Sequence, residues 1–119
     1  MSETELIIQQ KKISGNFGYE VKVRKVPPSP IYPDGYKINC ALWLIEEKRK
    51  ILILDAHEPF GTHLHPEPET NHDLRISVPL KDPIEVVEYF SVIVNRILSS
   101  ADYKKVIQEV VNEANQYQI

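Results

Sequence analysis

Hydrophobic and polar positions alternate along the first half of the chain, which is the pattern of β-strands. Val21 and Val23 alternate with charged residues in the segment Tyr19–Val26, as expected for a half-buried strand. The segments 36–45 (YKINCALWLI) and 50–55 (KILILD) are apolar at both alternating sets of positions, and the polar stretch EEKR lies between them. They predict a central β-hairpin that is covered on both faces. The proline-rich stretch PPSPIYPDG, which precedes this hairpin, predicts a loop.

The last third of the chain has apolar residues at helical spacing. Asp82, Pro83 and Glu85 supply an N-cap, a proline at the first helical position and a capping-box acid. A second amphipathic helix is predicted from about Ala101 onward. The apolar stripes are Val86, Val87, Phe90, Ile93, Val94 and Ile97 in the first helix, and Tyr103, Val106, Ile107, Val110, Val111, Ala114 and Tyr117 in the second. Because strands come first and helices last, we expect an α+β fold: a small antiparallel sheet of about four to six strands followed by two C-terminal helices packed on one face.

Composition narrows the class of protein. A chain of 119 residues with 42% hydrophobic and 26% charged residues is expected to fold as a single domain. The net charge of -3 argues against a wholly basic surface for nucleic acid, although a local basic patch stays open. No stretch approaches the roughly 20 apolar residues that span a membrane, so we expect no membrane partner. Cys40 is the only cysteine, which excludes an intrachain disulfide and favours a cytoplasmic location.

The histidines are concentrated in one short region between the central hairpin and the first predicted helix. They are His57, His63, His65 and His72. Imidazole titrates near neutral pH and is also the commonest metal ligand, so a group of histidines indicates a chemical site. In an extended segment His63 and His65 share one face, as do Asp55 and His57.

The length of the loop after His57 decides whether these two pairs meet. A four-residue loop, Glu58 to Gly61, would place His57 opposite Thr62 and the two pairs on opposite faces of the hairpin. A five-residue loop, Glu58 to Thr62, would place His57 opposite His63 and Asp55 opposite His65, which gives one cluster. We expect the longer loop, because Gly61 can adopt the positive φ that a bulged, odd-length loop needs.

A converged cluster supports two chemistries. In a metal-free site, two imidazoles act as general base and general acid on a phosphodiester, and a nearby cation stabilises the developing negative charge. In a metal site, two histidines and a carboxylate bind a divalent ion. A third interpretation is structural, with histidines that cap turns and bind carbonyl groups. The candidate catalytic residues are His57, His63, His65, Asp55 and Lys37, and the candidate substrate-binding residues are Arg75 and Tyr36. We expect no bound metal or cofactor.

Several segments taken in order resemble a known family. The stretches VPPSP, DGYKI, ILILDAHEPFGTHLH and DPIEVVEYF are similar to the TumE-like family, small toxins of bacterial and archaeal type II toxin–antitoxin pairs. The resemblance covers roughly residues 19 to 98, and its most specific part is the pattern D-x-H-x-x-x-G-x-H-x-H. The family's prolines, lysine, aspartate and H-x-H fall on Pro27 and Pro28, Lys37, Asp55, and His63 with His65.

The chain also departs from this family pattern. Many relatives have Asn after the aspartate and Arg between the two histidines, where this chain has Ala56 and Leu64. The second change removes a guanidinium, which is a natural ligand for phosphate. The predicted helix beyond about Ser100 exceeds the usual family length, and we interpret it as an element for antitoxin docking or for dimerisation.

The resemblance implies a cellular role and a partner. It implies a toxin that is bound by a helix-turn-helix antitoxin, and RNA cleavage follows by analogy with other toxins of this broad type. RNA and a second copy of the chain are therefore further candidate partners. The alternative is a noncatalytic protein-binding module in which the histidine-rich hairpin is structural.

Overall fold

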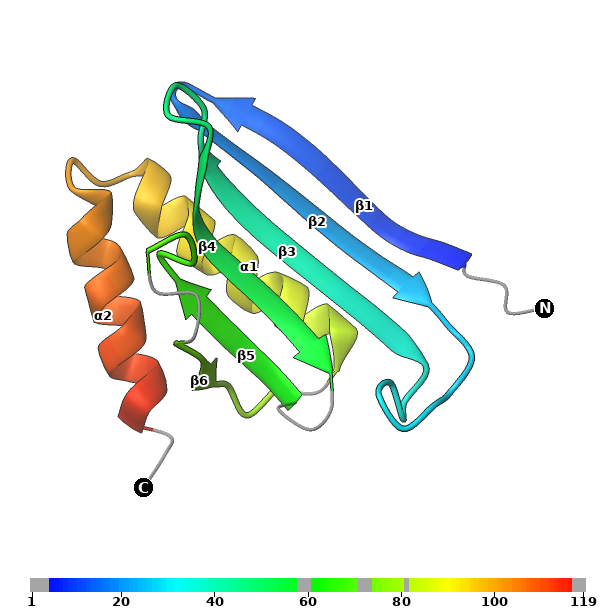
Figure 1. Cartoon of the computed structure of the whole chain (residues 1–119). Coiled ribbons are helices and arrows are strands. Elements are labelled where there is room, and N and C mark those ends of the chain that lie inside the picture. Colours follow the sequence, from blue (N-terminus) through cyan, green and yellow to red (C-terminus); the bar gives the residue numbers. More distant parts are fainter. Residues whose placement is uncertain (1–4, 58–60, 71–73, 81, 117–119) are drawn as a thin grey trace.

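The computed structural model of the chain describes residues 5–57, 61–70, 74–80 and 82–116. Within these residues, six strands form one antiparallel sheet whose spatial order follows the chain (Figure 1). The strands are β1 (Glu5–Ser14), β2 (Phe17–Lys25), β3 (Tyr36–Leu44), β4 (Arg49–His57), β5 (Gly61–Pro66) and β6 (Ile76–Ser77). Two helices follow, α1 (Pro83–Leu98) and α2 (Tyr103–Asn115). The predicted α+β fold is confirmed.

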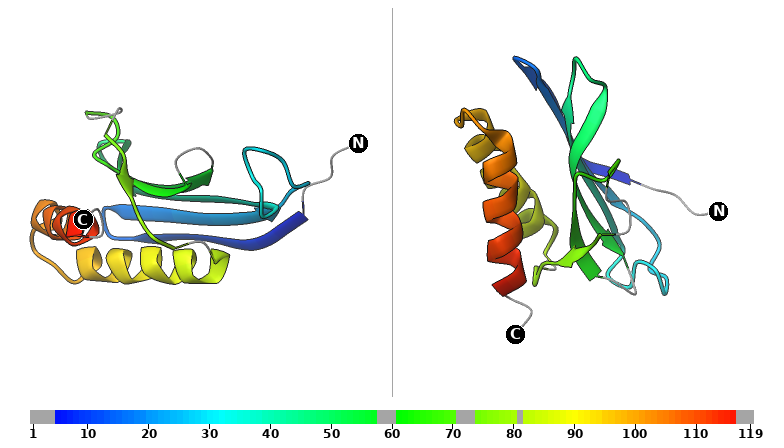
Figure 2. Two further views of the ribbon diagram at one scale, coloured as in Figure 1. Left: turned by 90° about the horizontal axis from the view of Figure 1, so that it is seen from below. Right: turned by 60° about the vertical axis from the view of Figure 1, so that its left-hand side comes forward.

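Both helices lie on the same side of the sheet (Figure 2, right). Helix α1 contacts β2 and β3, and α2 contacts α1 and β6. The sheet therefore has one face covered by helices, called here the helix face, and one face without them, called the open face. No helix in the described part of the chain is long and apolar enough to cross a membrane.

The hydrophobic core fills the space between the helix face and the helices. Val21, Cys40, Leu54 and Leu64 form one row across β2 to β5, and each is at most 1% exposed. Phe90 of α1 is the largest fully buried side chain. Removing a buried aromatic ring of this kind costs about 3–5 kcal/mol of stability, so this layer fixes the sheet in place.

The open face carries the residues that alternate with the core positions. Trp43 and Ile53 point to this side and are half-buried. We expected both faces of the central hairpin to be covered, and this is wrong for the open face, because α1 and α2 both lie on the other side. Only at one end of the open face does the loop between β2 and β3 rise above the sheet (Figure 2, left). Apolar residues at both sets of positions proved compatible with an incompletely covered sheet.

The beginnings of both helices follow from capping residues. Asp82 is the N-cap of α1, and its Oδ1 accepts a hydrogen bond of 2.8 Å from the backbone N–H of Ile84. Pro83 is the first residue of α1, as predicted. Helix α2 begins slightly later than expected, at Tyr103, because Asp102 caps it. The predicted stripe residue Tyr117 lies outside the described residues.

Polar contacts between distant residues attach α2 to the rest of the molecule. Arg49 at the start of β4 contacts Glu67, and its Nη2 donates a hydrogen bond of 3.0 Å to the hydroxyl of Tyr103. Arg96 of α1 donates hydrogen bonds of 2.8 Å to Glu113 and 3.1 Å to Glu109 of α2. These contacts hold α2 against both α1 and the end of the sheet.

Candidate functional site

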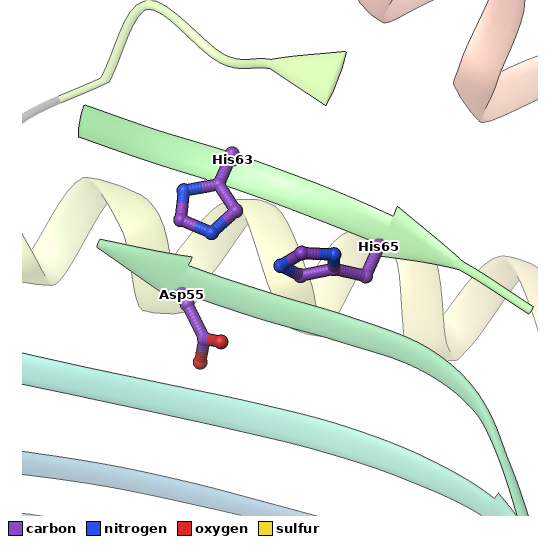
Figure 3. Close-up of side chains that lie close together, drawn as sticks. All are labelled: Asp55, His63 and His65. Carbon is purple, nitrogen blue, oxygen red and sulfur yellow. The ribbon is translucent and has the colours of Figure 1, made fainter. Parts of the chain in front are cut away.

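Asp55, His63 and His65 converge on the open face, and we call these three residues the Asp–His cluster (Figure 3). Asp55 of β4 lies directly opposite His63 of β5, and His65 lies two residues further along the same strand. One potential ligand atom from each of the three side chains lies within 4.8 Å of the other two. The centroids of the two imidazole rings are 4.7 Å apart, and the ring planes make an angle of 83°.

The register of this hairpin differs from the expected one. His57 pairs with Gly61 and Asp55 pairs with His63, so three residues separate the first pair. The five-residue loop, which would place Asp55 opposite His65, is therefore wrong. Both loop lengths are odd, so both put the aspartate on the face that carries the histidines, and the cluster forms in either case. Gly61 has a φ of 66°, the positive value expected of it.

The strands hold the cluster on a rigid support. Leu54 and Leu64 pair with each other between the cluster residues, and both are fully buried against the helices. Because side chains alternate along a strand, burial of these leucines directs Asp55, His63 and His65 to the open face. The site is therefore positioned by the core itself.

Hydrogen bonds fix the orientation of each side chain in the cluster. The Nδ1 atom of His63 lies 2.8 Å from the carbonyl oxygen of Gly61, and the Nδ1 atom of His65 lies 3.2 Å from that of Leu74. A carbonyl oxygen only accepts, so each Nδ1 carries a proton, and a neutral ring then has its lone pair on Nε2. Figure 3 shows the far edges of both rings directed toward the space beside Asp55.

Burial separates the roles available to these residues. His63 is 0% exposed, whereas Asp55 and His65 are half-buried. A group that exchanges protons with a substrate must lie within hydrogen-bond reach of it. Asp55 and His65 therefore border the surface, and His63 forms the floor of the site.

Several cations lie on the same face as the cluster, among them Lys22, which pairs with Asn39 and forms an ion pair with Glu20. Lys37 of β3 pairs directly with Arg24 of β2, and both are half-buried. Like charges directly opposite each other in an antiparallel pair are destabilising, and a bound anion would relieve this repulsion. Lys37 is also two residues from Asn39, whose side chain contacts Asp55. The cation pair is thus adjacent to the cluster along β3.

Asn39 is a site residue that the sequence analysis missed. Its Nδ2 donates a hydrogen bond of 3.0 Å to Oδ1 of Asp55, with which it is paired across β3 and β4. The signal was present in the sequence, because Asn39 lies two residues from Lys37 and therefore shares its face.

Tyr36 is not brought into the cluster. Tyr36 packs against the core on the helix face and lines a pocket of about 610 Å³ there. Arg75 is exposed and directly precedes β6, whose Ile76 is buried opposite Leu64, so alternation places Arg75 on the face that carries His65. The backbone of His57 ends β4, but its side chain lies outside the described residues, as does the whole of His72.

Cys40 lies beneath the cluster, on the helix face. It is 1% exposed, and burial, followed by the charge of Asp55, raises the pKa of its thiol from 9.0 to about 12. Reactive cysteines are thiolates in exposed, electropositive surroundings. Cys40 is therefore a core residue without nucleophilic character.

Fold and site together define an α+β protein with an Asp–His cluster on the open face, the side of an antiparallel sheet opposite α1 and α2 (Figure 2). Comparison of the chain with protein-family models, with curated proteins and with solved structures finds no match.

Proposed function

We propose that this protein is the toxin component of a prokaryotic type II toxin–antitoxin pair and that it acts on RNA at the Asp–His cluster. The observation that carries the proposal is the convergence of Asp55, His63 and His65 on the open face of the sheet. The resemblance of the sequence to the TumE-like family supports the cellular role, since Asp55, His63 and His65 are residues of the family pattern. An RNA target agrees with action in the cytoplasm, where the single cysteine stays reduced.

The cations beside the cluster suit a phosphate-bearing substrate. Lys37 and Arg24 lie opposite each other, and the resulting repulsion is relieved when a phosphate group binds between them. Arginine and lysine are the usual ligands of the nucleic-acid backbone. The net charge of -3 means that this attraction is local, so binding should involve few phosphates and depend only moderately on salt.

Asp55 and His65 are the residues placed to act on such a substrate. Both are half-buried at the surface of the open face, and hydrogen bonds from Asn39 and to Leu74 hold them in position. Lys37 would stabilise negative charge that develops on phosphate during cleavage. The N–H at Nδ1 of His65 donates to the carbonyl oxygen of Leu74, so Nε2 is the ring nitrogen left to contact the substrate.

Expression in cells tests the proposed function. Induction of the wild-type chain should arrest growth and degrade cellular RNA, and the variants Asp55→Asn and His63→Ala/His65→Ala should abolish both effects. Lys37→Gln should weaken them, whereas Lys105→Gln, an exposed lysine of α2, should leave them unchanged. Circular dichroism of each purified variant confirms that it is folded. A harmless wild-type chain, or equal toxicity in the cluster variants, would overturn the proposal.

The toxin class also predicts a partner. A gene for a small helix-turn-helix antitoxin should lie beside the gene for this chain, and coexpression of that protein should abolish the toxicity. The amphipathic helix α2 is the element we expect to contribute to antitoxin docking or to a homodimer.

A noncatalytic protein-binding module is the second candidate function. The observation that favours it is that His63 and His65 each bind a backbone carbonyl, of Gly61 and Leu74, which is what loop-fixing histidines do. In this case purified protein would capture a protein partner without turnover of RNA. The cluster variants would then lose stability, and their effect on partner binding would follow that loss.

A further inference from the structure

We infer that the Asp–His cluster is a binding site for one divalent transition-metal ion of the Zn²⁺ type. The ligands are Nε2 of His63, Nε2 of His65 and the carboxylate of Asp55. This inference deepens the proposed function and rests on it only for the biological role of the ion, because metal binding is a property of the isolated chain.

The spacing of the ligand atoms fits an ion. One nitrogen or oxygen from each of Asp55, His63 and His65 lies within 4.8 Å of the others. Ligands at about 2.0–2.1 Å from a tetrahedral ion are about 3.3 Å apart, so the cluster has to contract by about 1.5 Å at most. Because the buried Leu54 and Leu64 hold the strands in place, this contraction requires rotation of the three side chains.

The surrounding hydrogen bonds are those of a metal site. A histidine that binds metal through one ring nitrogen usually donates the other N–H to a carbonyl or carboxylate. His63 and His65 both do so, to Gly61 and Leu74. Asn39 in turn donates a hydrogen bond to the carboxylate of Asp55. All three ligands therefore have a second partner that fixes their orientation.

Burial favours a metal over proton transfer as the role of His63. Its ring is 0% exposed and its Nε2 is buried, so a large substrate such as RNA does not reach it. A ligand at the floor of a metal site needs no such access. Asp55 and His65 are half-buried, so the ion would keep open positions toward solvent, as in catalytic metal sites.

The donor set selects the kind of ion. Two imidazole nitrogens suit zinc and its first-row neighbours, whereas Mg²⁺ and Ca²⁺ prefer ligand sets made of oxygen. The sequence alone favoured a site without metal. The hydrogen bonds of the two Nδ1 atoms, which the sequence does not reveal, reverse that preference.

Metal titration of the purified full-length chain tests the inference. The protein is stripped with a chelator, dialysed, and titrated with Zn²⁺ in a calorimeter, and Co²⁺ is added separately to record its visible absorption. We expect one ion per chain and no binding of Mg²⁺. Asp55→Asn and His65→Asn should weaken Zn²⁺ binding by at least about tenfold, and Asn39→Ala by about 10–100-fold through loss of orientation.

The controls separate this site from adventitious binding and from misfolding. Asp34→Asn, which removes an exposed carboxylate of the β2–β3 loop, should bind Zn²⁺ like the wild type. Circular dichroism without metal verifies that each variant is folded. Absence of stoichiometric Zn²⁺ binding, or full affinity in Asp55→Asn and His65→Asn, would overturn the inference. A chain that binds no Zn²⁺ but degrades RNA would refute only the metal site, and a chain that binds Zn²⁺ but is harmless in cells would refute only the proposed function.

Discussion

The buried thiol of Cys40 makes the stability of the fold depend on alkaline pH. Its pKa is 9.0 in an exposed thiol and about 12 in the folded chain, chiefly because burial penalises the thiolate and secondarily because of the charge of Asp55. Above pH 9 the unfolded chain loses this proton while the folded chain keeps it, so stability falls as the pH rises toward 12. At about 1.4 kcal/mol per pH unit, the free energy of unfolding decreases by about 2 kcal/mol near pH 10.5. The decrease approaches about 4 kcal/mol once the pH reaches the folded pKa of about 12.

The matched variant is Cys40→Ala. Urea unfolding, followed by the fluorescence of Trp43, gives the free energy of unfolding of both proteins near pH 7.5 and near pH 10.5, with a reductant present. The variant is less stable at both pH values because of the cavity, but its decrease between them should be smaller than that of the wild type by about 2 kcal/mol. Equal decreases in the two proteins would refute the reasoning. In Asp55→Asn the decrease should be slightly smaller than in the wild type, since the secondary cause of the shift is removed.

Three further predictions concern stability, each measured by urea unfolding. Asp82→Ala removes the N-cap of α1 and should cost about 1 kcal/mol, whereas Asp82→Asn should cost much less; equal costs would argue against the cap. Tyr103→Phe removes the hydroxyl that Arg49 binds and should cost about 1 kcal/mol, and no change would mean that this bond is not formed in solution. Arg96→Ala breaks partly exposed ion pairs with α2 and should cost less than about 1 kcal/mol, an effect that about 1 M NaCl should reduce; a larger, salt-independent loss would contradict the assignment.

The sequence predicted those parts of the fold that local chemistry determines. The start of α1 follows from Asp82 and Pro83, and both apolar stripes follow from helical spacing. The face of Tyr36 was also predictable, because it lies two residues before the buried Ile38 and therefore points to the helices. Its assignment to the substrate site overlooked this alternation.

Other features depend on contacts that no local pattern contains. The bond between Arg49 and Tyr103 joins residues 54 positions apart, and it appears only when α2 has docked. The register of β4 and β5 was missed by two residues because the positive φ of Gly61 is compatible with more than one odd loop length. The tautomers of His63 and His65 depend on which backbone carbonyls lie within hydrogen-bond distance of their rings. These contacts are the basis of the metal site that we infer.

In β5 the residues that fold the protein and those that form the candidate site occupy alternate positions of a single strand. Replacing an outward residue leaves Leu64 and its neighbours in the core untouched, whereas gain or loss of one residue within the strand would exchange the inward and outward sets. Substitutions and insertions or deletions in β5 would thus have different effects on the protein. A substitution at an outward position changes the candidate site in a chain that still folds, whereas an insertion or deletion within the strand disrupts both the fold and the candidate site.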